Sequence, residues 1–288
     1  LGCLIDAAYF HPEGDVFVLE THKTFKFLYV GGSIPRKGFD ILLKAYCQAF
    51  SSEDDVCLVI KDFGGKDWYA KHSMLASLLS KQADAQLPEI VIVAEDNLSD
   101  HALASLYRAC DVYVHPYRGE GFGMGILEAM SCGLPAVVPA SGPAPEFCPE
   151  SCGWYVPVLT HFLTQTPVLF GLDHVERYTS LPSFFDEPDL HALKGLLKSL
   201  PLQADLCQKK GRAARQQALK YAWKDCAALA EKRLLQLAHL PEAYRVKRAR
   251  HQKQYLDLQI VLTKSPTEAL PLITEAYSDF SGFSWELP

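Results

Sequence analysis

Between residues 23 and 157 the chain repeats one pattern, in which a short run of apolar, often β-branched residues is followed by a stretch with apolar residues at helical spacing. This alternation is typical of a parallel sheet whose strands are joined by helices. The apolar runs are nearly continuous, which indicates strands that are covered on both faces. We expect six strands, at residues 27–30, 56–60, 90–93, 112–115, 136–138 and 154–156.

Apolar residues three or four positions apart mark two helices between these strands. Their members are Leu42, Leu43, Tyr46, Cys47 and Phe50 in the first helix, and Leu103, Leu106, Tyr107 and Cys110 in the second. Ser99 precedes the second stripe and is expected to cap that helix. The predicted fold class is therefore α/β, with a Rossmann-like, doubly wound parallel sheet that binds ligands at the carboxyl ends of its strands.

The remainder of the chain is less regular. Residues 158–182 have the composition of a loop, whereas residues 188–240 are expected to be helical. Residues 241–288 form a helical or irregular extension of unknown role. Its basic residues between 245 and 253 are typical of a solvated helix face rather than a binding patch.

Charge and hydropathy exclude several classes of protein. The chain has 28 Lys+Arg and 34 Asp+Glu, a formal net charge of −6, which argues against nucleic acid as a partner. No run approaches the ~18 apolar residues of a membrane helix, and a signal-peptide pattern is absent. We expect a soluble, cytoplasmic protein without a transmembrane segment. Nine cysteines without a C-x-x-C pair predict reduced thiols rather than a disulfide framework or a zinc site.

The strongest chemical signal is the segment EGFGMGILEAMSCGLP, residues 120–135, which follows the fourth expected strand. Three glycines within five residues let the backbone approach a ligand, and a helix then begins near Met124 with unpaired N–H groups. A phosphate or sugar oxygen could lie against those amides. Glu120 and Glu128 could face the same cleft and accept hydrogen bonds from sugar or ribose hydroxyls. A bare pair of glutamates is more often a pair of surface caps, but the glycines favour the functional interpretation.

A second turn, residues 30–38, joins the first expected strand to its helix. Gly31 and Gly32 permit a close approach, and Arg36 or Lys37 can neutralise a diphosphate. The turn does not spell G-x-G-x-x-G, and no acidic partner stands about 20 residues further on. A nicotinamide-dependent dehydrogenase is therefore disfavoured.

Two further strand ends carry polar residues. His115 could contact a ligand, and a satisfied structural histidine is the alternative. Lys61 and Asp62 end the second strand, where either a place in the cleft or a salt-bridged surface pair fits the sequence.

Together these residues resemble a known family. Residues 28–156 are similar to the donor-binding half of the retaining, two-domain glycosyltransferases of the GT-B fold, and more narrowly to family 4, which includes bacterial mannosyltransferases and sucrose synthase-like enzymes. The resemblance is carried by Gly31-Gly32 with Arg36-Lys37-Gly38, by residues 106–111, 115–123 and 127–130, and by Gly133-Leu134-Pro135 and Gly142. The E-x7-E block from Glu120 to Glu128 is specific.

The resemblance implies roles for matching residues. Glu120 would hold hydroxyls of the transferred hexose, Lys37 would contact the diphosphate, and these two would form the catalytic pair. Glu128 would bind the nucleotide ribose. The other donor-binding residues would be Gly31, Gly32, Arg36, Lys61, Gly121, Phe122, Gly123 and Met124, with Val93 and Ala94 flanking the base. No metal or cofactor is implied beyond the substrate, such as a UDP- or GDP-hexose, because fixed positive potential stabilises the leaving diphosphate.

The resemblance also implies a reaction and a domain organisation. A hexose would pass from the nucleotide sugar to an unknown glycan, lipid or protein acceptor with retained anomeric configuration. Residues 1–22 look like the connector between the two domains, so we expect an amino-terminal acceptor domain to be missing and this chain to transfer poorly. Residues 23–187 would bind the nucleotide sugar, and residues 188–240 would be the helical part of the same domain.

Two positions depart from the family pattern. Gly32 stands where the family often has arginine, so Arg36 or Lys61 would have to supply that charge. Gly125 stands where the family often has proline or threonine, which is expected to loosen the helix start by about 1 kcal/mol.

Two alternatives remain open. The chain could be a non-catalytic nucleotide-sugar-binding or scaffold protein, or another enzyme of the same fold class, such as a sugar-nucleotide epimerase or a phosphorylase that uses pyridoxal phosphate.

Overall fold

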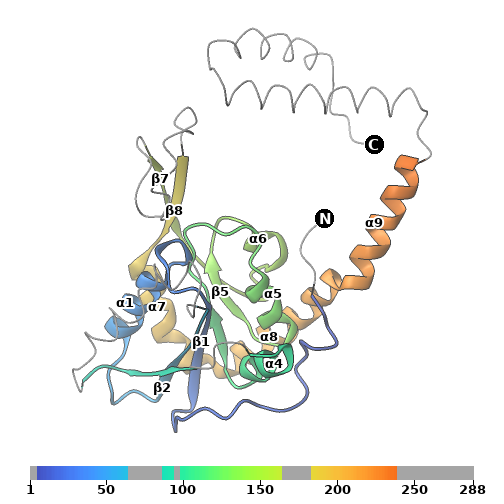
Figure 1. Cartoon of the computed structure of the whole chain (residues 1–288). Coiled ribbons are helices and arrows are strands. Elements are labelled where there is room, and N and C mark those ends of the chain that lie inside the picture. Colours follow the sequence, from blue (N-terminus) through green and yellow to red (C-terminus); the bar gives the residue numbers. More distant parts are fainter. Residues whose placement is uncertain (1–4, 64–85, 94–97, 164–182, 239–288) are drawn as a thin grey trace. The chain divides into compact units, whose positions relative to one another are not determined.

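The computed structural model describes residues 5–63, 86–93, 98–163 and 183–238 (Figure 1). Six strands in this part of the chain form one parallel sheet with the order β3-β2-β1-β4-β5-β6. Their bounds are Phe25–Gly31 (β1), Val56–Asp62 (β2), Glu89–Ile92 (β3), Val112–Val114 (β4), Ala136–Pro139 (β5) and Gly153–Val156 (β6). Each lies at a predicted position, and the prediction of a Rossmann-like, doubly wound sheet is confirmed.

The strand order reverses between β1 and β4. Leu28 of β1 lies opposite Val59 of β2 on one side and opposite Tyr113 of β4 on the other. From β1 the chain builds outward to β2 and β3, then returns to β4 and builds in the other direction. Sheets of this kind bind ligands at the carboxyl ends of the two strands that flank such a reversal.

Helices cover both faces of the sheet (Figure 1). Helices α1 (Phe39–Ala49) and α7 (Leu190–Ser199) cover one face, and α4 (Asp100–Arg108), α5 (Met124–Ser131) and α8 (Ala204–Ala218) cover the other. Phe27 packs in the core beneath α1 and α7, and Leu28 packs in the core beneath α4, α5 and α8. Both side chains are fully buried, which explains why the apolar runs of the strands are continuous. The other described helices are α6 (Ala144–Phe147), α9 (Trp223–Ala238) and the 3-10 turns η1 (Pro35–Lys37), η3 (Leu200–Gln203) and η4 (Leu219–Tyr221).

The helix starts follow from local sequence. The Ser99 hydroxyl accepts a hydrogen bond from the amide of Ala102 at 3.3 Å, so the predicted cap of α4 is confirmed. Helix α5 begins at Met124, as predicted, after Gly123 with a φ of +89°. Helix α1 begins after Gly38, whose φ of +69° turns the chain sharply out of η1.

The prediction of a loop over residues 158–182 is wrong for residues 158–163, which form a strand. Strand β7 (Val158–Leu163) pairs antiparallel with β8 (Ser183–Pro188), so that Thr160 lies opposite Asp186. Neither strand has the continuous apolar character of the main sheet, because this pair stands apart from it as a two-stranded hairpin. Residues 164–182 lie outside the described residues. The predicted helical region is confirmed in α7, α8 and α9. The first of these helices, α7, begins at Leu190 rather than at Pro188.

The chain divides into two compact units, residues 1–227 and 228–288. The first contains the sheet and the predicted connector, which is described from Ile5 onward and packs closely. The amide of Ile5 donates to the carbonyl of Tyr221 at 3.0 Å, and the hydroxyl of Ser131 donates to the carbonyl of Phe10 at 2.6 Å. The predicted extension at residues 241–288 lies outside the described residues, and the domain boundaries stay predictions.

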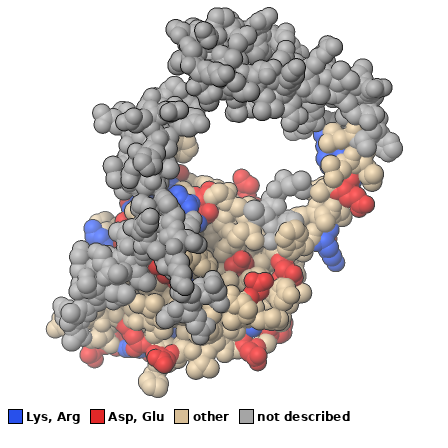
Figure 2. Space-filling view, in the orientation of Figure 1, with Lys and Arg blue, Asp and Glu red and all other residues tan. Residues whose placement is uncertain are grey.

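On the face shown in Figure 2, acidic side chains of the described residues recur over much of the surface and basic ones appear at fewer places, in line with the formal net charge of −6. None of the described helices is long and apolar enough to cross a membrane. The expected cytoplasmic location stays a prediction. Of the eight cysteines in the described ranges, six are buried, and seven lie in or beside the two apolar cores.

Candidate functional site

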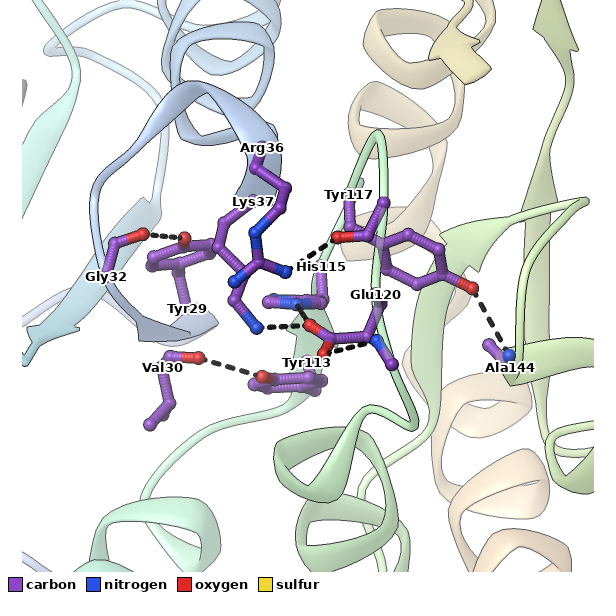
Figure 3. Close-up of polar contacts among 12 residues, drawn as sticks. Tyr29, Val30, Gly32, Arg36, Lys37, Tyr113, His115, Tyr117, Glu120 and Ala144 are labelled. Atoms are coloured by element: carbon purple, nitrogen blue, oxygen red, sulfur yellow. Dashed lines mark hydrogen bonds and ion pairs between the residues drawn. The ribbon is translucent and has the colours of Figure 1, made fainter. Parts of the chain in front are cut away.

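The loops that leave β1 and β4 meet at the carboxyl edge of the sheet (Figure 3). The guanidinium of Arg36 donates to the carbonyl of Gly119 at 2.9 Å, and the carbonyl of Arg36 accepts from the amide of Arg118 at 2.9 Å. The turn that carries the predicted basic residues therefore lies directly against the loop that carries Glu120.

Glu120 and Lys37, the predicted catalytic pair, are in contact (Figure 3). The ammonium of Lys37 donates to Oε2 of Glu120, and Nε2 of His115 lies 3.4 Å from the same oxygen. The other oxygen, Oε1, accepts from the amide of Gly121 at 3.0 Å. The side chains of Glu120 and Lys37 are only 11% and 17% exposed, so this ion pair is largely shielded from water.

The surroundings of Glu120 keep it ionised. Burial raises the pKa of Glu120, but the hydrogen bond with His115 and the contact with Lys37 outweigh burial and hold that pKa well below its ordinary value. An ionised carboxylate is purely an acceptor, which suits it to the hydroxyls of a sugar.

The lowered pKa of Glu120 predicts how stability depends on pH. Its carboxylate stabilises the fold above the pKa of an unfolded glutamate, about 4.3, and this contribution is lost as the pH falls through the folded value. We therefore expect the unaltered chain to be more stable than Glu120→Gln at pH 7, and the gap to shrink below about pH 5. Urea unfolding at several pH values measures it. The exposed Glu53→Gln is the control, and a gap that stays constant down to acid pH would contradict the expectation.

His115 is a partner of Glu120 inside a stack of aromatic rings. Its ring lies 5.6 Å from that of Tyr29 and 5.8 Å from that of Tyr113, nearly parallel to both. Burial lowers the pKa of His115, although the hydrogen bond with Glu120 opposes this, so the ring is neutral at pH 7 and carries its proton on Nε2. Its Nδ1 is buried without a hydrogen-bond partner among the described residues, so His115 is not a fully satisfied structural histidine.

Glu128 lies on α5 and is held by a tyrosine. The hydroxyl of Tyr107 donates to Oε2 of Glu128 at 2.9 Å. Burial raises the pKa of Glu128, and the bond from Tyr107 only partly opposes it. A carboxylate kept under such a penalty is more typical of a binding site than of a stabilising contact.

The pKa of one buried hydroxyl, that of Tyr113, responds to both carboxylates. The hydroxyl of Tyr113 donates a hydrogen bond to the carbonyl of Val30 at 3.0 Å (Figure 3). After burial itself, the charges of Glu128 and Glu120 are what raise the pKa of Tyr113. The hydroxyls of Tyr113 and Tyr107 both lie beside Gly125, so the carboxylate that Tyr107 holds is near the carboxyl end of β1, where Val30 binds Tyr113.

The glycine loop leads into an open helix end. No side chain in the described ranges caps α5 at Gly123. The amides of Ile126 and Leu127 donate to the carbonyl of Gly123, so the amides of Met124 and Gly125 are the ones that face the open helix end. The ring of Phe122 stacks on that of Phe147 at 5.1 Å, which leaves the backbone of Phe122 as its polar contribution to the site. This arrangement suits an anion or a sugar oxygen beside Glu120.

Gly125 is explained by its neighbours. A Cβ at this position would lie 2.7 Å from the hydroxyl of Tyr113 and 3.3 Å from that of Tyr107. The two tyrosines thus occupy the space that a side chain at position 125 would need.

A double-mutant cycle tests this explanation. Gly125→Ala is expected to destabilise the chain by about 1–3 kcal/mol through overpacking, although alanine favours helices. In a Tyr113→Phe background the 2.7 Å clash disappears, so Gly125→Ala should cost at least about 1 kcal/mol less there than in the unaltered chain. Urea unfolding of the four proteins gives the coupling energy. Additive effects would contradict the explanation.

The other predicted donor-binding residues lie at the same edge, except Ala94, which is outside the described residues. Gly31 ends β1, and the carbonyl of Gly32 accepts from the hydroxyl of Tyr29 at 2.8 Å. Lys61 is buried at the end of β2, where its ammonium donates to the carbonyl of Asp62 at 3.0 Å. The predicted charge replacement by Arg36 or Lys61 stays a prediction.

Two strand ends complete the edge. Asp62 binds the hydroxyl of Ser33 at 2.7 Å and its amide at 3.1 Å, and so fixes the turn after β1. Val93 is buried just beyond β3, whereas Ala94 lies outside the described residues. Within the ranges that the structure covers, no group of three or more His, Cys, Asp or Glu residues is placed to hold a metal ion.

Comparison with known proteins decides the family. Residues 15–158, which are half of the 288 residues of the chain, match the family model described as Glycosyl transferases group 1. The chain belongs to this family. The match to glycosyl transferases group 1 contains both loops of the site and both glutamates, as the resemblance in the sequence predicts.

Curated relatives align with less than half of this chain. D-inositol 3-phosphate glycosyltransferase 1 of Catenulispora acidiphila is 34% identical over 125 residues, which cover 42% of this chain and 29% of that protein. O-antigen chain mannosyltransferase B of Escherichia coli is 36% identical over 110 residues, which cover 38% of this chain and 27% of that protein. The chain thus aligns with less than a third of the length of these relatives.

Solved structures confirm the fold as that of a GT-B domain. Sucrose-phosphate synthase from Thermosynechococcus elongatus superposes with a TM-score of 0.60 at 22% identity, over 82% of this chain and 51% of that one. The C-terminal domain of a glycosyl transferase group 1 protein from Francisella tularensis superposes with a TM-score of 0.52 at 18% identity, over 76% of this chain and 99% of that one.

Proposed function

We propose that this domain binds the nucleoside diphosphate hexose of a retaining hexosyltransferase in the glycosyl transferases group 1 family. Glu120 accepts hydrogen bonds from hexose hydroxyls, Glu128 accepts them from the ribose, and the first amides of α5 receive the distal phosphate. Val93 and Ala94 flank the base, and Gly31 and Gly32 let the diphosphate approach the backbone.

The observation that carries this proposal is the placement of two carboxylates beside an uncapped helix end at the reversal between β1 and β4. A nucleotide sugar has hydroxyls at both ends and a diphosphate between them. Glu120 and Glu128 provide acceptors for the hydroxyls, and the helix end provides donors and positive potential for the phosphate. The charges of the ligand and the site are therefore complementary.

The chemistry of transfer follows from the same groups. The bond from the anomeric carbon to the diphosphate breaks, and negative charge grows on the departing phosphate oxygen. Lys37 and Arg36 stand at the turn facing that position, and with the end of α5 they supply fixed positive potential in a shielded site. This mechanism requires no metal ion, and retention of configuration is proposed on the resemblance to family 4.

The acceptor side of the reaction belongs to the proposal as well. The chain spans less than a third of the curated relatives described above, so a complete transferase would need an acceptor-binding domain in addition to this one. We propose a glycan, lipid or protein as acceptor. Among the relatives, one is named for an O-antigen chain, which is a glycan, and another for an inositol phosphate, which is a small phosphorylated polyol outside this range.

A panel of nucleotide sugars tests donor binding. We expect UDP-glucose, GDP-mannose or a related donor to raise the Tm of the chain by about 5 °C or more at ~100 times its Kd. Glu128→Ala should abolish the shift, and Glu53→Ala should keep it. A panel without any shift, or an equal shift in Glu128→Ala, would contradict the proposal.

The alternatives are separated by a second assay. A scaffold protein would bind the donor without turnover, and an epimerase would convert it without releasing the nucleotide. Release of free nucleoside diphosphate on adding an acceptor to the complete protein favours a transferase over both.

A further inference from the structure

We infer that Arg118 is a positioning residue for Glu120, and that the β7–β8 hairpin holds Arg118 in place. The inference rests on the proposed function and adds to it that the hairpin contributes to hexose binding. The contacts of one guanidinium group, together with the position of Glu120 two residues further along the same loop, carry it.

Arg118 binds two carboxylates from distant parts of the chain. Nη1 and Nη2 donate to the two oxygens of Asp40 at 2.7 and 2.8 Å. Nε and Nη2 donate to the two oxygens of Glu187 at 2.5 and 2.9 Å. Nη1 also donates to the carbonyl of Pro35. The side chain is 8% exposed, so this cation is held almost out of water.

These contacts join three elements to one loop. Asp40 lies in the first turn of α1, Pro35 begins η1, and Glu187 lies on β8. The amide of Asp186 also donates to the carbonyl of Arg118 at 3.3 Å, so the hairpin contacts the backbone of the loop as well as the guanidinium. A planar guanidinium satisfies several acceptors in fixed directions, which makes the arrangement rigid.

The clamp formed by Arg118, Asp40, Glu187 and Pro35 sets the distance across the site. Pro35 belongs to the same turn as Lys37, and Arg118 belongs to the same loop as Glu120. The contact between Lys37 and Glu120 therefore depends on how the turn and the loop are held together. We expect the carboxylate of Glu120 to lose its fixed direction when the clamp is opened.

Glu128 does not depend on the clamp. It lies on α5, whose residues pack in the core, and its carboxylate is held by Tyr107. Opening the clamp at Glu187 leaves Arg118 bound to Asp40 and to the carbonyl of Pro35, so the turn that carries Lys37 stays held. This change should therefore weaken contacts to the hexose more than contacts to the nucleotide. A general loss of stability would weaken both alike, so the two roles are distinguishable.

The hairpin side of the clamp lies outside the segment that the family model matches. That match ends at residue 158, where β7 begins, whereas Asp40 and Arg118 lie inside it. The hairpin contact is thus a feature of this chain that the family model does not supply.

Isothermal titration of UDP-glucose and UDP, or of GDP-mannose and GDP, tests the inference on the whole chain. We expect Glu187→Ala to weaken binding of the nucleotide sugar about tenfold and binding of the nucleoside diphosphate by less than about twofold. Arg118→Ala should give a larger difference, and Arg118→Lys an intermediate one because lysine lacks the planar fork. The control is Asp186→Ala, whose carboxylate binds Thr160 across the hairpin at 2.6 Å and should change neither affinity by more than about twofold.

The outcomes separate the two claims. Equal losses for both ligands, no loss in Glu187→Ala, or the same loss in Asp186→Ala would overturn the positioning role. Glu187→Ala keeps the pair between Arg118 and Asp40, so it serves as the test even where Arg118→Ala fails to fold. An unaltered chain that binds no nucleotide sugar would contradict the proposed function itself, and the role of the clamp with it.

Discussion

Replacing Glu128 by glutamine is expected to weaken binding of the nucleotide sugar roughly 30- to 100-fold while leaving the chain at least as stable at pH 7. The loss of affinity follows from removing a charged acceptor for the ribose hydroxyls. The stability follows from the pKa of Glu128, which burial raises. A raised pKa means that the group stabilises the fold when protonated, below the unfolded pKa of about 4.3, and that this contribution is lost as the pH rises through the folded value.

Glutamine is neutral at every pH and can still accept the bond from Tyr107, so it escapes the cost of a buried charge. Calorimetric titration gives the affinity, and urea unfolding at pH 7 and pH 4 gives the stability. A Glu128→Gln chain that is clearly less stable at pH 7, with affinity unchanged, would show that Glu128 is a structural residue and would contradict its placement in the site.

Replacing Gly38 by alanine is expected to destabilise the chain by about 3–5 kcal/mol and to abolish donor binding. Gly38 has a φ of +69°, and a Cβ there would lie 1.8 Å from the carbonyl oxygen of Pro116. Backbone would meet backbone, so no change of side-chain conformation can relieve the clash. The loop after β4 would have to move away from the turn, and Glu120 would separate from Lys37.

Gly121→Ala is the matched control for this change. A Cβ at Gly121 would meet no atom of the described residues within 4 Å, so its effect on stability should stay within about 0.5 kcal/mol. Thermal and urea unfolding of both variants measure the difference. Similar stabilities for the two variants would contradict the close approach of the turn to the loop.

The main sheet could be predicted from sequence because its strands are buried on both faces. Leu28 and Val59 belong to continuous apolar runs, and such runs between amphipathic helices fit few other folds. The β7–β8 hairpin could not be predicted in the same way. Thr160 and Asp186 pair across 26 positions, and neither strand shows the continuous burial of the main sheet.

The site could be predicted in part. Glycine spacing and the two glutamates indicated an anion and hydroxyl site, and the resemblance placed Lys37 beside it. The partners of these groups were missed, because Tyr107 and Tyr113 look like ordinary members of an apolar stripe and a strand. Only the packed structure shows that their hydroxyls reach Glu128 and the carbonyl of Val30.

Arg118 was missed for a related reason. Its carboxylate partners, Asp40 and Glu187, lie 78 and 69 positions away along the chain, and no local spacing connects them. Charged pairs of this kind are set by tertiary packing, so a single sequence carries little signal for them.

The central claim is that one nucleotide sugar lies across Glu120, the start of α5 and Glu128. A crystal structure of the chain with the donor that gives the largest thermal shift tests it most directly. We expect hexose hydroxyls at Glu120 and ribose hydroxyls at Glu128, each within about 2.7–3.2 Å of a carboxylate oxygen, with the distal phosphate at the first amides of α5. A donor bound at another edge of the sheet, with neither glutamate in contact with it, would contradict the account.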